Sequence, residues 1–211
     1  MRALYVVGFG YVAFSGLVLL TGWRGGGAPE MALPADAPPV HQPAPGPAPA
    51  LGSSAEEWFA SMKPYCNTLE VETRHSYTPP PATSEGAAYS AACYALAGKI
   101  VRARQIILGL SEGDRRAAAS VVFQVGHPVA DAGDDASAGP IMRLVVEFTP
   151  ENYMALYHAG ISEKMLGEND FARRHLEMFL EAYRYSDGWR ASAISALREL
   201  GVEPQLSPRL P

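Results

Sequence analysis

The stretch Tyr153–Tyr183, YMALYHAGISEKMLGENDFARRHLEMFLEAY, decides the fold of this chain. Its first half carries a narrow strip of small residues that can face a neighbouring helix. Gly167 can adopt the positive φ that ends a helix, and Asp170 is placed to cap the next helix. The second half repeats apolar residues at helical spacing, namely Phe171, Ala172, Leu176, Phe179 and Leu180. The stretch therefore predicts two amphipathic helices in a hairpin, which needs further helices to bury its apolar faces.

The same pattern recurs upstream with a period of about 34 residues. Gly98, Gly133 and Gly167 align as the turn between two helices, at spacings of 35 and 34 residues. Each has a small residue seven positions earlier, an alanine five positions later and a large apolar residue four positions beyond the alanine. In an alignment of the three copies, the small residues are Ala91, Gly126 and Gly160, and the alanines are Ala103, Ala138 and Ala172. The large apolar residues are Ile107, Met142 and Leu176, which completes three aligned columns beside the glycines. Because small residues let helix axes approach and bulky ones fill the gaps, the columns predict three stacked hairpins over residues 84–186.

The period and the small residues at the helix crossings resemble the tetratricopeptide repeat, in about three degenerate copies. The third copy is the most similar, because its residues stand where the family prefers Trp or Leu, Gly, Gly, Ala and a large apolar residue: Leu156, Gly160, Gly167, Ala172 and Leu176. The second copy keeps Val122, Gly126, Gly133, Ala138 and Met142, and Pro150 stands at the family's closing proline.

Two prolines depart from the pattern in the second copy. Proline is tolerated in the first turn of a helix but interrupts its interior. We therefore expect the second helix of this copy to begin near Pro140, and residues 127–138, which contain Pro128, to form in part a long loop.

Helical caps are expected at both ends of the repeats. Residues 53–78 begin with two overlapping capping boxes at Ser53 and Ser54 and form N-terminal capping helices. Residues 187–201 form a C-terminal capping helix that begins at Asp187, ends at Gly201 and turns inward Trp189, Ala193, Ile194, Leu197 and Leu200. Residues 202–211 are expected to be a disordered tail.

The N-terminal region predicts a membrane anchor and a linker. Residues 3–23 contain no charged side chain, and as a helix they would span about 31 Å, enough to cross the hydrocarbon core. We expect a single transmembrane helix within residues 1–24; a cleaved signal peptide is the alternative. Arg2 and Arg24 flank the run, so the charge pattern does not orient it. Residues 25–52, rich in Pro, Ala and Gly, read as an extended linker.

Cys66 and Cys93 are the only cysteines. In an oxidising compartment they could form one disulfide that closes a loop of about 28 residues; two unrelated buried thiols are the alternative. Neither has the CxxC spacing of a redox or metal motif. Anchor, cysteines and composition together favour a single-pass protein of the bacterial inner membrane with a soluble periplasmic domain, or a periplasmic protein after signal cleavage. A net charge of −5 without a Lys/Arg cluster argues against nucleic acid as a partner.

The resemblance implies a binding groove, because the family presents the first helix of each repeat on a concave face that holds a partner peptide. When the family's groove-facing positions are transferred to this sequence, they fall on three groups of residues. These are Ala88 and Ala92 in the first copy, Phe123, His127 and Asp131 in the second, and Met154, Tyr157, Ile161 and Lys164 in the third. This set suits an apolar or mixed segment. The alternative is that Phe123 and Tyr157 only pack within a short array.

One stretch has side chains that could converge on a metal ion. His127, Asp131, Asp134 and Asp135 lie within nine residues and could bind Ca²⁺, Mn²⁺ or Zn²⁺. Their spacing matches neither an EF-hand loop nor an HExxH helix. The alternative is a solvated turn in which an aspartate caps a helix and His127 packs beside Phe123.

No catalytic or nucleotide-binding motif is present, and His158 and His175 have no carboxylate at metal-ligand spacing in the sequence. We therefore expect no cofactor and no enzymatic activity. The sequence favours a membrane-anchored scaffold or adaptor that binds a protein or peptide. The alternatives are a small metal-dependent hydrolase centred on the His127–Asp135 stretch, or a fixed structural subunit of a larger membrane complex.

Overall fold

The computed structural model describes residues 54–204, and this part of the chain is all-helical, without a strand. The all-α prediction is therefore confirmed for these residues. The elements are α1 (Ala55–Met62), η1 (Lys63–Tyr65, a 3₁₀ turn), α2 (Val71–Tyr77), α3 (Ser84–Leu96), α4 (Ile100–Leu108), α5 (Glu112–Asp131), α6 (Asp135–Phe148), α7 (Tyr153–Met165), α8 (Asn169–Ala182) and α9 (Gly188–Glu199).

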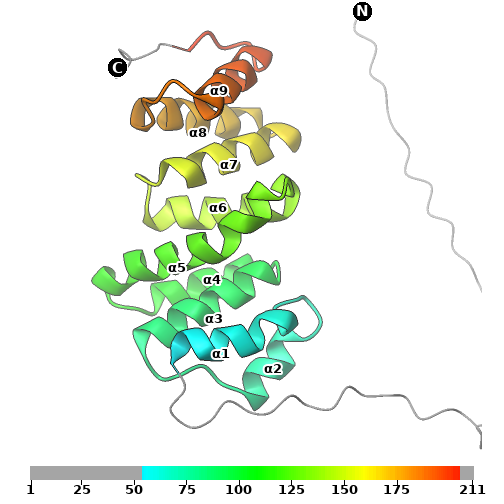
Figure 1. Ribbon diagram of the computed structural model, residues 1–211, viewed down its shortest axis with the longest axis vertical. Helices are drawn as coiled ribbons and strands as arrows, with labels where there is room; N and C mark the ends of the chain where they lie inside the picture. Colours follow the sequence, from blue (N-terminus) through cyan, green and yellow to red (C-terminus); the bar gives the residue numbers. More distant parts are fainter. Residues whose placement is uncertain (1–53, 205–211) are drawn as a thin grey trace, which may run out of the picture. The chain divides into compact units, whose positions relative to one another are not determined.

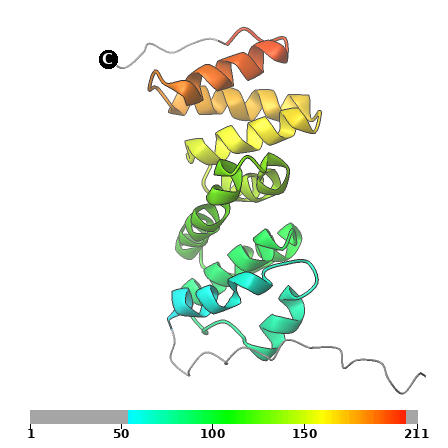
Figure 2. The ribbon, with the colours of Figure 1, turned by 45° about the vertical axis from the view of Figure 1, so that its right-hand side comes forward.

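Three helical hairpins follow one another from α3 to α8. Helices α3 and α4, α5 and α6, and α7 and α8 pack as pairs, and the pairs are stacked in chain order (Figures 1 and 2). The turns lie at Gly98, Gly133 and Gly167, whose φ angles are 73°, 83° and 76°. Only glycine adopts this region without a steric penalty. The predicted turn positions are therefore confirmed.

The three hairpin turns share one hydrogen-bonding scheme. The residue after each glycine donates its N–H to the carbonyl five residues back, over 2.9 Å from Lys99, 3.2 Å from Asp134 and 2.8 Å from Glu168. This is the Schellman cap, which satisfies carbonyls left free at a helix end. The same cap closes α9, because Gly201 has a φ of 79° and Val202 donates to Leu197 O over 2.9 Å. Gly201 follows Gly167 by 34 residues, so α9 ends on the same period as the first helices of the hairpins.

Glycines make the close helix crossings. A Cβ built on Gly126 of α5 would lie 2.7 Å from Ile141 Cγ2 of α6, and one on Gly160 of α7 would lie 2.7 Å from Leu176 Cγ of α8. One on Gly139 of α6 would overlap the side chain of Ser162 in α7. The space between crossings is filled by fully buried side chains from all parts of the stack, among them Trp58, Ile107, Met142, Leu156, Leu176, Phe179 and Leu197.

The expected interruption of the second hairpin is wrong. Helix α5 continues through Pro128 to Asp131, and α6 begins at Asp135 with Pro140 in its interior. Each proline removes one backbone hydrogen bond. The loss at Pro140 is offset because the Asp134 side chain caps α6 by accepting from Ser137 N, and because Ala138 and Gly139 are buried next to Pro140.

Both flanking helical segments form, but Trp189, which was expected to turn inward, is exposed, whereas Ala193 and Leu197 are buried. Ser54 and Glu57 make the capping box of α1, and Asp187 accepts from the backbone of Trp189 and Arg190 at the start of α9. The Cys66–Cys93 disulfide is present and joins the end of η1 to α3, across 27 positions of sequence. Asp170 does not cap α8 as expected: Glu168 stands at the N-cap and makes no side-chain cap, while Asp170 pairs with Arg173.

Across residues 54–204, no helix combines the length and the apolar character that a membrane crossing requires. The predicted anchor within residues 1–24, the linker at 25–52 and most of the C-terminal tail lie outside the described residues.

Candidate functional site

Helices α1 and α9 cover the positions at which the first and third hairpins were expected to contribute to a groove. Phe59 of α1 stacks on Tyr89 of α3 with ring centroids 5.2 Å apart, and Ala88 and Ala92 are buried. Because these alanines offer no surface, they are unavailable to a partner.

Helix α9 covers part of the groove expected on the third hairpin. The Tyr157 hydroxyl donates to Ser192 Oγ over 2.8 Å, and the Tyr157 side chain is buried. Lys164 forms an ion pair with Glu199 of α9, and Ile161 packs with the apolar cluster that includes α9. Of this hairpin's four predicted groove residues, Tyr157 is therefore buried, whereas Met154, Ile161 and Lys164 keep partial exposure.

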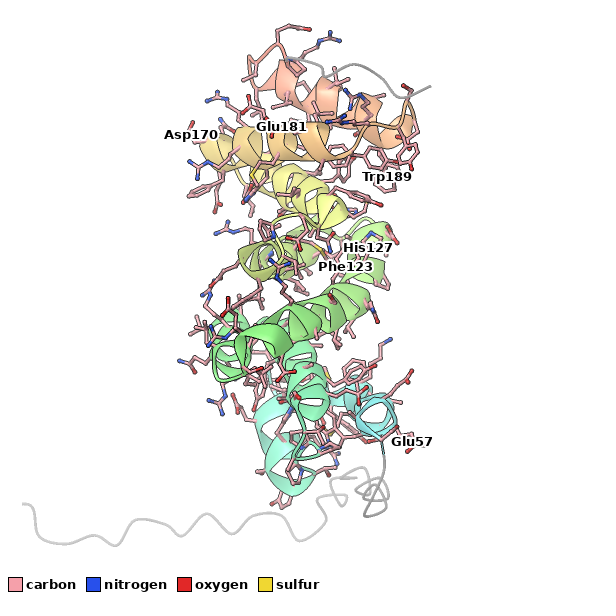
Figure 3. All side chains as sticks on the ribbon, turned by 90° about the vertical axis from the view of Figure 1, so that its left-hand side faces the viewer. Glu57, Phe123, His127, Asp170, Glu181 and Trp189 are labelled. Atoms are coloured by element: carbon pink, nitrogen blue, oxygen red, sulfur yellow. A yellow bond between two sulfur atoms is a disulfide. The ribbon has the colours of Figure 1, made fainter. Side chains whose placement is uncertain are left out.

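The middle hairpin keeps its predicted residues accessible. Phe123 and His127 of α5 are partly exposed, and their rings stack at 4.7 Å between centroids. Figure 3 shows them on the same side of the stack as Glu57 of α1 and Trp189 of α9, with Asp170 on the opposite side. We call this side, defined by Phe123, His127 and Trp189, the α5 face.

His127 belongs to the α5 face and also lies at the edge of a cluster of two histidines and two aspartates. His127 Nδ1 is 3.5 Å from Asp131 Oδ2, one helical turn away on α5. His158 of α7 lies with Nε2 4.0 Å from Asp131 Oδ1 and Nδ1 3.7 Å from Asp135 Oδ1 at the start of α6. The two imidazole rings are 5.2 Å apart in an edge-on arrangement. We call these four residues the His–Asp cluster.

His158 is buried without being satisfied. Its side chain is 3% exposed, and neither of its ring nitrogens has a hydrogen-bond partner among residues 54–204. Burial lowers the pKa of His158, and the neighbouring His127 lowers it further, while Asp135 and Asp131 act in the opposite direction. Burial is the largest of these effects, so the His158 imidazole is held in its neutral form.

The four residues predicted as metal ligands divide into two groups. His127, Asp131 and Asp135 belong to the cluster, whereas Asp134 caps α6 by accepting from Ser137 N. Hydrogen bonding from the Ser137 side chain, and then from its backbone, lowers the pKa of Asp134. Three donor atoms, one each from His127, Asp131 and His158, lie within 4.8 Å of one another. His127 also packs beside Phe123, as the alternative prediction held.

His158 was missed because it lies 31 residues from His127. A signal was present in the repeat register: His127 lies six positions before Gly133, and His158 lies nine before Gly167. These two offsets from the turn glycine differ by three positions, which is about one helical turn. The two histidines therefore lie on the same face of the equivalent helices α5 and α7. The stacking of those helices then brings the two side chains together.

His175 takes part in a separate buried network. Its Nδ1 lies 2.7 Å from an oxygen of Glu163, which is fully buried in α7, and Arg143 of α6 lies 3.7 Å from the other oxygen. The network holds α6, α7 and α8 together. Because Glu163 at the centre of this network is not exposed to solvent, we interpret the network as a packing feature.

Comparisons of this chain with protein-family models, with curated proteins and with solved structures gave no match.

We expect stability to fall between pH 8 and pH 5.5. Burial lowers the folded-state pKa of His158, and burial is also the main cause of the lowered pKa of His75. In the unfolded chain a histidine takes up its proton near pH 6.5. As pH falls through that value the unfolded state binds protons that the folded state does not, so unfolding becomes easier until the folded-state pKa values are passed.

Urea unfolding of the protein at pH 8, 7, 6 and 5.5, with EDTA present, measures this loss. His158→Gln and His75→Gln should each flatten the dependence of the unfolding free energy on pH. Stability that is equal at pH 8 and pH 5.5 in the wild type would contradict the prediction.

Proposed function

We propose that this chain is a membrane-anchored scaffold of the tetratricopeptide-repeat type, which binds a protein segment on the α5 face. The observation that carries the proposal is the partial exposure of the stacked Phe123 and His127 between two covered hairpins. Partly exposed aromatic side chains that are rigidly held are typical anchors in protein interfaces. The three hairpins with turn glycines at a period of 34–35 residues support assignment to a helical solenoid.

The covering of the flanking hairpins restricts where a partner binds. Tyr157, Ala88 and Ala92 are buried by helices of the chain itself. A partner segment therefore meets Phe123, His127 and Trp189, and the partly exposed Met154 is a further candidate on α7. This surface is aromatic and carries no lysine or arginine at these positions, which suits an apolar or mixed segment better than an acidic one.

The proposed location rests on residues 3–23 and on the disulfide. An uncharged run of this length is typical of a membrane-spanning helix. The Cys66–Cys93 disulfide fits an oxidising compartment, because reducing compartments keep thiols free. We therefore place the helical domain on the periplasmic side of a bacterial inner membrane, joined to its anchor by the linker at residues 25–52.

Site-specific photocrosslinking in cells tests the function. A photoreactive residue at Gln124, which is exposed on α5 beside Phe123, should give a discrete crosslinked product with another protein. The matched control is the same residue at Asp170, on the opposite side of the stack (Figure 3).

Two alanine variants sharpen the test. Phe123→Ala and Trp189→Ala should each reduce the crosslinked product from Gln124 at least tenfold, because truncating an anchor residue costs about 2 kcal/mol of binding or more. Circular dichroism and the unfolding midpoint check that both variants stay folded. Equal crosslinking from Asp170 and Gln124 would instead favour a fixed subunit enclosed by a larger complex, and a product unchanged by both variants would contradict binding on the α5 face.

A further inference from the structure

We infer that the His–Asp cluster binds one transition-metal ion of the Zn²⁺ class, with His127, Asp131 and His158 as ligands. This inference goes beyond the proposed function and does not depend on it, because every ligand belongs to this chain. The ion would connect α5 to α7 behind the α5 face.

The donor atoms are already close to a coordination geometry. One donor atom from each residue lies within 4.8 Å of the other two. His127 Nδ1 is 3.5 Å from Asp131 Oδ2, and His158 Nε2 is 4.0 Å from Asp131 Oδ1, so the two histidines approach different oxygens of the same carboxylate. Zinc holds nitrogen and oxygen ligands at about 2.0–2.2 Å in a tetrahedron, which places neighbouring donors about 3.3–3.6 Å apart. The remaining contraction is within reach of side-chain rotation, because Asp131 is half exposed and His127 is only partly buried.

His158 fits the role of ligand better than the role of packing residue. Its side chain is 3% exposed and its ring nitrogens, like Nε2 of His127, have no hydrogen-bond partner in the described part of the chain. Separations of 3.7–4.0 Å to the two carboxylates exceed hydrogen-bond length. Buried polar atoms without a partner are rare in folded proteins, and a metal ion bound at Nε2 of His158 would satisfy that nitrogen.

Asp135 stands 3.7 Å from His158 Nδ1, on the side where a metal-bound histidine usually has a supporting hydrogen-bond acceptor. It faces Nδ1 of His158, while Nε2 faces Asp131. A proton on Nδ1 directed at Asp135 leaves Nε2 with its lone pair free for the ion. Asp135 is therefore a positioning residue, and Asp134, which caps α6, lies outside the site.

The donor set selects the class of metal. Two imidazole nitrogens and one carboxylate suit Zn²⁺, Co²⁺ or Ni²⁺, whereas Ca²⁺ takes six to eight oxygen ligands. Three protein ligands leave one position of a tetrahedral ion for water or another small ligand. The half-exposed Asp131 gives the ion a route from solvent.

Titration of the full-length protein tests the inference. The protein is purified in detergent without a polyhistidine tag, stripped with EDTA, dialysed and titrated with ZnCl₂ in a calorimeter. We expect saturable binding of one ion per chain and a rise in the unfolding midpoint with Zn²⁺ concentration. Co²⁺ should bind the same site and show the intense visible absorption of a tetrahedral complex.

Variants separate this site from adventitious binding. Asp131→Asn and His127→Gln each remove a ligand at a partly exposed position, and each should weaken Zn²⁺ binding at least 100-fold and abolish the rise in the midpoint. Asp135→Asn should weaken binding about 10–100-fold, as loss of a contact that orients a ligand does. The matched control is Asp134→Asn, whose amide oxygen still caps α6 and which should bind as the wild type does.

The result that overturns the inference is the absence of saturable binding by the wild type up to 1 mM Zn²⁺, or binding that Asp131→Asn and His127→Gln leave unchanged. His158→Gln removes the most buried ligand and so tests the site most directly, but a change at this buried position can also prevent folding. If that variant does not fold, the two partly exposed positions decide the outcome.

Discussion

Replacing both Cys66 and Cys93 by alanine is expected to lower the free energy of unfolding by about 3–4 kcal/mol. The disulfide closes a loop of 27 sequence positions, and restricting such a loop in the unfolded chain is worth this much in the chain-entropy description. Denaturant unfolding of the variant and of the wild type, both without reductant, measures the difference. Adding reductant to the wild type should reproduce the loss, and adding it to the double variant should have no effect.

The loss should be concentrated at the N-terminal end of the stack. The disulfide joins η1 to α3, so without it α1 and α2 are held only by side-chain contacts such as the stacking of Phe59 on Tyr89. Hydrogen exchange is expected to speed up in α1 and α2 and to stay unchanged in α7 and α8. Uniform acceleration through α8 would show instead that the whole stack unfolds as one unit.

Gly139→Val is expected to destabilise the protein by about 3 kcal/mol or more. A Cβ at this position overlaps both Oγ and Cβ of Ser162, which is buried in α7, so α6 and α7 have to separate. Overpacking a tight contact costs about 1–3 kcal/mol for small additions, and valine adds two further methyl groups. The matched control is Gly113→Ala in the first turn of α5, where nothing lies within 4 Å of the added Cβ and the change should be within about 0.5 kcal/mol of neutral.

A compensating exchange tests the cause of this effect. If contact between residue 139 and Ser162 is responsible, then Gly139→Ala combined with Ser162→Gly should be less destabilising than the sum of the two single changes, by about 1–2 kcal/mol. Additive free energies would show that residue 139 acts through the backbone of α6 alone.

The positions of the hairpin turns could be predicted because the requirement is local. A Schellman cap needs a residue with positive φ, and glycine at 98, 133 and 167 supplies it whatever the rest of the chain does. The disulfide could be predicted because two cysteines allow one pairing. Gly201 was interpreted only as the end of a capping helix, although its spacing from Gly167 continues the same period.

The features that were missed depend on tertiary contacts. Pro128 and Pro140 argue for a loop when only local preference is considered, but burial of Ala138 and Gly139 keeps α6 helical. The covering of Tyr157 by α9 agrees with the alternative that this side chain packs within the array, and it contradicts the groove position that the repeat pattern assigns to Tyr157. His158 joins Asp131 and Asp135 only because α5, α6 and α7 meet there, whereas the candidate set predicted from the sequence contained both aspartates and Asp134 but not His158.

The Cys66–Cys93 bond also determines how the domain would respond to mechanical tension. A pull applied to the chain before Ser54 loads α1 first, and contacts such as the Phe59–Tyr89 stack can be peeled away one by one. Beyond Cys66 the covalent bond carries the load directly to α3, so residues 67–92 are shielded and cannot lengthen the chain. Stretching from this end would therefore release only a short length of chain before the stacked hairpins themselves bear the force.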